Sequence, residues 1–379
     1  MGHLNNYSVL FPPWYCPTWS LQFDAFKVDR YINSQPNSRP DQGSPDVAHS
    51  GVPGLIPGVS RAGVPVWDYI TFPSAMIAAA NKGKGWHLMT AVEWAILAEW
   101  SRLNGTMPHG GNANTNPPAD VTYTSEVAQL DAHLHGENAA YHRALPGTGP
   151  NTWAHNHKEN GVWDLQGLTW QWLMGLAGVG TDWTANGYPR ILAKTDLKYG
   201  TSAFGRGTIS GSGGATPTLT CDGAGVNWLK AWTADEFNTM YIYIAEAAAG
   251  AGAWYTITDT TATTIILTAA DAPGNGTATF YVAKVISHDI TAGMTSGHNI
   301  LTLEDANADL KPFAIPATAD ATGSNTYGKD IYYYSKGAET AARRGGSFYN
   351  VASAGVFALD LTSRGDANID LSFRACKCL

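Results

Sequence analysis

The chain has 379 residues, enough for one large domain or two of ordinary size, and it is 44% hydrophobic but only 14% charged. Its many glycines (41), tryptophans (14) and tyrosines (17) indicate a rigid, loop-rich fold and exclude a disordered chain or a helical bundle. The net charge is −8 without an evident basic patch, so nucleic acid and acidic membrane surfaces are not expected as ligands.

Targeting and cysteine signals are weak. No apolar run approaches the roughly 18–20 residues of a membrane span, and the first residues lack the basic and apolar regions of a signal peptide. We therefore expect neither a transmembrane segment nor membrane insertion. The four cysteines, Cys16, Cys221, Cys376 and Cys378, are too few for a disulfide-built scaffold. They are predicted to be inert thiols or to form a local disulfide, and a metal or redox site at Cys376 and Cys378 is the alternative.

The first part of the chain reads as loops followed by two helices. Residues 1–70 are rich in Pro, Gly, Ser and Asn, which favours ordered loop or extended chain. Good helix formers predict a first helix over 73–82. A second helix is predicted over 92–103, because Thr90 can cap it and Glu93 completes a capping box.

Histidines and then tryptophans mark the next stretch. His133, His135, His155 and His157 lie in a segment rich in Gly and Asn, where loop hydrogen bonding is the expectation and metal binding the alternative. The tryptophans around 163–172 alternate with leucines, which predicts a packed core element rather than a surface that stacks on sugars or bases. No Walker loop, nucleophile elbow or H-E-x-x-H motif is present.

The composition changes near residue 201. Between there and 285 the chain is rich in Thr, Gly and Ala, with strand-like runs at 239–247, 253–259, 263–269 and 278–285. These runs predict a small all-β module inserted into a larger domain; alternatively, the strands extend the main sheet. After 286 the earlier composition returns. The run 328–337 is predicted to be a strand. Because successive residues of a strand point to opposite faces, Tyr332, Tyr333 and Tyr334 cannot all face the core, and core packing and ligand recognition are both open for them. The run 343–379 is predicted to form strands separated by turns of small residues.

Segments in a fixed order carry a family resemblance: GWHLMTAVEWAILA (85–98), GVWDLQGLTWQWLMG (161–175), RRGGSF (343–348) and LSFRAC (371–376). The set resembles the C-type lectin fold of the formylglycine-generating-enzyme and sulfatase-modifying kind. The resemblance implies an α+β, C-type lectin-like domain over 1–200 plus 286–379, with the small all-β module inserted at 201–285.

The sequence departs from the enzymes of that superfamily at their functional positions. They carry a catalytic cysteine pair just after Gly-Gly-Ser-aromatic, whereas here Gly345-Gly346-Ser347-Phe348 is followed by no cysteine until Cys376. They often bind calcium through a motif like GNVWEW. Here Leu168 and Gln171 replace an oxygen ligand and a carboxylate, so calcium is only an alternative and no cofactor is expected.

The tail resembles the variable region of a diversity-generating retroelement variable protein. In that family, adenine-directed mutagenesis of AAC codons cannot produce Lys, Glu, Gln, Met or Trp, and Ser347–Arg374 contains none of these five. Matching the family pattern implies a variable ligand-binding surface with Tyr349 and Arg364 as anchors, on a frame held by Gly345, Gly346, Phe357 and Phe373. The residues of that surface are Tyr349, Asn350, Val351, Ser353, Asp360, Thr362, Ser363, Arg364, Asp366 and Asn368. Flanking aromatic contacts would come from Tyr332, Tyr333, Tyr334 and Phe348.

The sequence thus predicts a non-catalytic protein that binds a protein or glycan on another cell or surface. The inserted module is similar to a small domain of phage and bacterial surface proteins, which favours a virion or cell-surface setting. The alternatives are an oxidoreductase like the formylglycine-generating enzyme, or another enzyme on the same fold, and a structural virion component. The tail could also be simply the last strands of the fold. The oligomeric state stays open.

Overall fold

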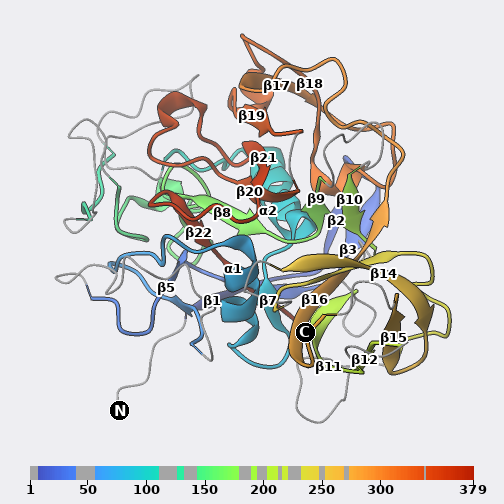
Figure 1. Cartoon of the computed structure of the whole chain (residues 1–379). Helices are drawn as coiled ribbons and strands as arrows, with labels where there is room; N and C mark the ends of the chain where they lie inside the picture. Colours follow the sequence, from blue (N-terminus) through green and yellow to red (C-terminus); the bar gives the residue numbers. More distant parts are fainter. Residues whose placement is uncertain are drawn as a thin grey trace.

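Figure 1 shows a computed structural model of the chain. The structure describes residues 7–39, 56–110, 126–131, 143–178, 189–193, 203–211, 216–220, 232–246, 252–268, 273–336 and 339–379.

The expected α+β, C-type lectin-like fold is wrong. Among the described residues, strands make up 37% and helix 12%, the α-helices number two, and six strands close into a barrel. The reason lies in the residue types, because long stretches after residue 200 are rich in Thr, Ile, Val and Tyr, which favour strands. The described part of the chain is therefore mostly β.

Both predicted helices are present. Helix α1 (Phe72–Ala80) starts after Thr71, whose hydroxyl accepts a hydrogen bond from the amide of Ser74. Helix α2 (Ala91–Leu103) begins with the predicted capping box: the Glu93 amide donates to the Thr90 hydroxyl at 3.0 Å, and the Thr90 amide donates to the Glu93 carboxylate at 2.8 Å. Both helices are buried along most of their length, so tertiary packing as well as capping holds them.

A seven-stranded mixed sheet carries the tail of the chain (Figure 1). Its strands, in spatial order, are β18 (Pro316–Asp320), β17 (His298–Leu303), β19 (Ile331–Tyr334), β21 (Leu359–Ser363), β20 (Thr340–Arg344), β8 (Trp170–Leu173) and β22 (Leu371–Phe373). The β19–β21 and β8–β22 pairs are parallel, and the other pairs are antiparallel. The tail strands β21 and β22 thus flank the central pair β20–β8.

The stretch predicted as an inserted module forms the barrel. Its strands, in order around the ring, are β11 (Phe204–Ser210), β12 (Thr218–Thr220), β15 (Thr264–Leu267), β14 (Ala253–Thr260), β13 (Tyr241–Ile244) and β16 (Gly276–Val285). Pairing of β16 with β11 closes the ring. Further along the same edge, β16 pairs with β10 (Arg190–Leu192), which in turn pairs with β9 (Leu176–Ala177), so strands from the preceding segment extend the barrel sheet.

A third sheet and two hairpin-like pairs complete the β structure. The four-stranded sheet has the order β1 (Ser8–Phe11), β4 (Phe26–Asp29), β23 (Ala375–Cys378) and β7 (Trp86–Leu88). The two-stranded pairs are β2 (Trp14–Cys16) with β3 (Leu21–Phe23), and β5 (Asn33–Ser34) with β6 (Val59–Ser60). Short 3-10 turns are η1 (Asn151–Trp153), η3 (Lys311–Phe313), η4 (Asn325–Tyr327) and η5 (Val351–Ser353). Among the described helices, none is long and apolar enough to cross a bilayer.

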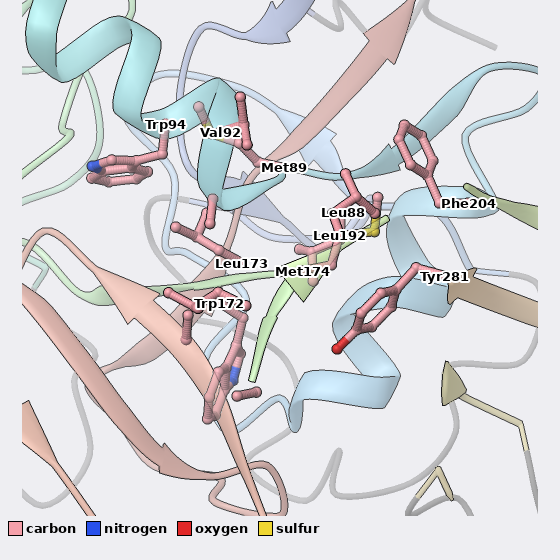
Figure 2. Packing of buried hydrophobic residues seen from close by; sticks show 14 of the residues in the cluster. Leu88, Met89, Val92, Trp94, Trp172, Leu173, Met174, Leu192, Phe204 and Tyr281 are labelled. Carbon is pink, nitrogen blue, oxygen red and sulfur yellow. The ribbon is translucent and has the colours of Figure 1, made fainter. Parts of the chain in front are cut away.

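One hydrophobic core runs through the helices, the central sheet and the barrel. Figure 2 shows its middle, where Leu88 of β7 lies beside Leu192 and Phe204. Val92 of α2, Leu173 of β8 and Tyr281 of the barrel belong to the same cluster. The tryptophans around 163–172 are buried, as predicted. The barrel is therefore packed against the rest of the protein rather than joined to it only by the chain.

Candidate functional site

A pocket of about 390 Å³ opens over the central sheet, a volume within the roughly 300–1,000 Å³ typical of ligand sites. Its wall comes from β8, β19, β20, β21 and the tail loop that follows β20. The lining residues are Trp170, Ser296, Tyr333, Tyr334, Ser335, Arg343, Ser347, Tyr349, Asn350, Asp360, Thr362 and Asp370. Aromatic rings, hydroxyls, one base and two acids therefore meet in one cavity.

Strand register explains this meeting. Tyr333 of β19 pairs with Asp360 of β21, which pairs with Arg343 of β20, so the three side chains form a row on one face of the sheet. The row on the other face includes Tyr332 and Leu359, and both are fully buried. One face thus packs into the core while the other forms the floor of the pocket.

Arg343 organises the pocket floor. Its Nε and one terminal nitrogen donate to Asp360 Oδ2 at 2.9 and 2.7 Å. Its guanidinium also lies over the ring of Trp170, at 5.3 Å from the centroid, and near Trp172 at 5.9 Å. The ion pair and the ring contacts hold the guanidinium in one orientation.

The two carboxyl groups of the pocket, Asp360 and Asp370, are largely buried from solvent. Burial raises the pKa of Asp360, against the opposing charge of Arg343. Burial also raises the pKa of Asp370, which Arg343 and a hydrogen bond from Ser347 oppose. Both carboxyls therefore gain from any further donor or positive charge that enters the cavity.

The tail loop is shaped by two glycines. Gly345 has φ +94°, and a Cβ there would lie 2.5 Å from the carbonyl oxygen of Leu165. Gly346 has φ +69°, and a Cβ there would lie 2.7 Å from Ala354. These positions suit glycine alone, so the loop has a defined path into the pocket.

Beyond the glycines, the loop is held by its own hydrogen bonds. The amide of Ser347 donates to Asn350 Oδ1 at 2.8 Å, and its hydroxyl lies 3.1 Å from the same oxygen. The amide of Tyr349 donates to the Ser347 hydroxyl at 3.3 Å. The Tyr349 ring stacks at a tilt on Phe348, with centroids 4.1 Å apart. These hydrogen bonds and the contact with Phe348 thus hold Tyr349 at the edge of the pocket.

The structure brings together some of the predicted surface residues. Tyr349, Asn350, Asp360 and Thr362 line the pocket, as do the flanking Tyr333 and Tyr334. Outside the lining lie Ser353, Ser363, Arg364, Asp366 and Asn368. The side chain of Val351 lies outside the described residues.

Two of the aromatic residues predicted to flank the surface, Tyr332 and Phe348, are buried instead. Tyr332 is fully buried and its hydroxyl donates to the carbonyl of Ile290 at 3.2 Å. Phe348 is 1% exposed and lies under Tyr349. Neither can form part of a contact surface, because the strand and the loop turn both side chains into the core.

Arg364, predicted as an anchor for ligand, ties the tail to the barrel. It forms an ion pair with Glu339 and donates to the carbonyl of Gly252 at 3.2 Å. Its guanidinium lies 5.7 Å from the ring centroid of Tyr243 in the barrel. These contacts give Arg364 a structural role between the two parts of the chain.

Sequence reasoning missed several lining residues, chiefly Trp170, Arg343 and Asp370. A signal for Arg343 existed, because consecutive arginines in a strand must point to opposite faces. Arg344 is the buried one, and it donates to the carbonyls of Phe313, Ala314 and Phe357. Trp170 was assigned to the core, although its register beside the tail strands also places it at the pocket.

The residues of the altered calcium motif do not fit a calcium ion. Leu168 is fully buried and offers no side-chain oxygen. Gln171 is fully buried, donates to the carbonyl of Asp164 at 2.8 Å and accepts from Arg374 at 3.0 Å. The guanidinium of Arg374 also donates to the carbonyl oxygens of Asp29 and Trp163. The guanidinium of Arg374 thus binds the oxygen atoms that surround Gln171.

The histidines show no metal geometry within the described part of the chain. His155 accepts a hydrogen bond from the Val162 amide at 2.8 Å, and His157 bonds the carbonyl of Met107 at 3.0 Å. Across the described ranges, no group of three or more His, Cys, Asp or Glu could hold a metal ion. The predicted His133 and His135 lie outside the described residues.

The described cysteines, Cys16, Cys376 and Cys378, are buried. Cys376 and Cys378 are not bonded to each other, so the local disulfide expected as one possibility is not formed. Burial raises the pKa of Cys16 to about 11, and burial raises the pKa of Cys376 as well. Cys221 lies outside the described residues. Neither Cys16 nor Cys376 is therefore activated as a nucleophile.

Comparison of the sequence with protein-family models and with curated proteins found no match.

Proposed function

We propose that this protein is a non-catalytic ligand-binding protein whose C-terminal surface is diversified by a retroelement. The observation that carries the proposal is the pocket over the central sheet. Four residues predicted to vary, Tyr349, Asn350, Asp360 and Thr362, line this one cavity although they are spread over the tail sequence.

The division between frame and surface supports this use. Phe357 and Phe373 are fully buried, and Gly345 and Gly346 set the path of the loop. Tyr349 and Thr362 are only half-buried and reach the cavity from this frame. Half-buried side chains such as Tyr349 and Thr362 can change without removing core contacts, which a diversified surface requires.

The rival function is oxidation of a substrate cysteine. That chemistry needs a thiolate that a substrate can reach. The described cysteines are buried, and none of them lines the pocket. Their burial supports ligand binding over the oxidoreductase alternative. A protein or glycan on another cell or surface remains the proposed partner, and a virion or cell surface the proposed setting.

The proposal is tested in the DNA that surrounds the gene. A nearly identical repeat of the 3′ coding sequence, differing mainly at adenines, together with a reverse transcriptase gene is the expected finding. Absence of both the repeat and the reverse transcriptase gene would overturn diversification. The pocket would then have to be interpreted as a site of fixed specificity.

A further inference from the structure

The charge of the pocket indicates what it binds. Asp360 and Asp370 line the cavity, and Asp366 accepts a hydrogen bond from the hydroxyl of the lining residue Thr362 at 3.0 Å. Among the described lining residues, Arg343 is the single base. The acids therefore outnumber the bases at the cavity.

The one base is already committed. Both hydrogen bonds from Arg343 to Asp360 go to the same oxygen, Oδ2. Asp360 is 7% exposed, and no hydrogen bond to its Oδ1 is found within the described parts of the chain. Asp370 has the Ser347 hydroxyl as its hydrogen-bond partner. Asp360 Oδ1 and the Asp370 carboxylate thus face the cavity, where Arg343 is the one cation among the described lining residues.

The wall of the pocket is aromatic. Trp170 and Tyr333 meet edge to face with centroids 6.5 Å apart, and Tyr334 and Tyr349 complete the wall. Aromatic faces attract cations through the ring quadrupole, and more strongly where water is excluded. An anion would meet the acids, and a neutral polyol would leave their charge unbalanced.

We propose that the pocket binds a cationic group, an alkylammonium or a guanidinium, as a Lys or Arg side chain of a partner protein would present it. This inference rests on the proposed function and names the ligand chemistry of the same site. In this arrangement Asp370 and Asp360 Oδ1 accept from the cation, and the tyrosine rings flank its aliphatic stem.

The test uses small probes and the full chain. Nα-acetyl-arginine amide and Nα-acetyl-lysine amide are titrated while the indole N–H resonance of Trp170 is followed by NMR. Nα-acetyl-citrulline amide serves as the uncharged analogue, and methyl glucoside as the neutral polyol. The expected result is saturable shifts with the two cationic probes and a Kd about tenfold or more weaker with citrulline. In the Asp370→Asn variant this preference should disappear.

Asp309→Asn is the matched control, because Asp309 is exposed and pairs with Lys284 outside the pocket. It should keep the preference, and equal melting temperatures should show that both variants are folded. Equal binding of citrulline or the glucoside, or no shift with any probe, would overturn the cationic ligand. These outcomes leave the proposed function intact, since the coding-sequence repeat tests that separately.

Discussion

Arg343 and Asp360 face each other across β20 and β21, directly paired in register and joined by two hydrogen bonds of 2.9 and 2.7 Å. The pair is mostly buried, with side chains 15% and 10% exposed. The same guanidinium also lies over the ring of Trp170, so the pair and this ring together form part of the pocket floor. Among the four lining residues predicted to vary, Asp360 is thus the one tied into the floor of the cavity, and the others can change around it.

This relationship predicts strong coupling between the two residues. In a double-mutant cycle of Arg343→Met and Asp360→Asn, the coupling in the free energy of unfolding should be about 0.5–3 kcal/mol. Each single variant leaves a partly buried charge or amide without its partner, and the double variant removes both. Urea denaturation of the unsubstituted protein, the two single variants and the double variant gives the coupling. Strictly additive effects would show that the ion pair does not contribute to stability.

Phe348 and Tyr349 offer a test of frame against surface in neighbouring residues. Phe348→Ala should lower the free energy of unfolding by roughly 3–5 kcal/mol, because the ring is buried. Tyr349→Ala should cost less than about 1 kcal/mol, because the ring is half-buried at the pocket edge. Chemical denaturation measures both. Equal costs would mean that Tyr349 belongs to the core and cannot vary freely.

Arg364 should matter for stability rather than for ligand. Arg364→Ala removes the ion pair to Glu339 and the hydrogen bond to Gly252, at a cost of about 1–3 kcal/mol. Amide hydrogen exchange in β13 should also speed up, because the guanidinium lies by Tyr243 of that strand. The neighbouring Ser363→Ala is the control. If Arg364→Ala changes neither quantity, the contact between tail and barrel contributes nothing.

Part of this structure follows from sequence, and part depends on contacts that sequence does not reveal. The capping box of Thr90 and Glu93 is local, so residue types alone predict it. Four of the six barrel strands, β13 to β16, were predicted from their sequence, whereas β11 and β12 were not. Closure of the barrel depends on pairing between β11 and β16, which are distant in sequence.

The same limit applies to the pocket. Alternation indicates that Tyr332, Tyr333 and Tyr334 face different ways, but the side that is buried depends on which strand pairs with β19. Resemblance placed Tyr349 and Thr362 at the site, whereas Trp170 and Arg343 reach it through the register of β8 and β20. The fold class was wrong because a few ordered motifs do not determine how the remaining strands close.

Asp164 predicts a pH dependence of stability. Burial raises the pKa of Asp164 from 3.8 to about 7, against the opposing charge of Arg374. The folded state thus holds this proton more tightly than the unfolded state, so the stabilisation by protonation is present at low pH and is lost as the pH rises through about 7. Asn can replace Asp164 at its φ of +58°.

The melting temperature of Asp164→Asn relative to the unsubstituted protein should therefore increase from about pH 4 to about pH 8. The comparison with the variant is needed because burial lowers the pKa of His155 to about 4, which gives the opposite trend. Scanning calorimetry across this range measures the difference. A difference that stays constant with pH would show that Asp164 does not titrate there.

The central claim is that the residues lining the pocket vary on a constant frame. It is tested most directly by sequencing the 3′ end of this gene in many copies from one population. The account predicts that amino-acid changes concentrate at Tyr349, Asn350 and Thr362, whereas Gly345 and Phe357 stay unchanged. Changes spread evenly along the tail, or as frequent at Phe357 as at Tyr349, would contradict it.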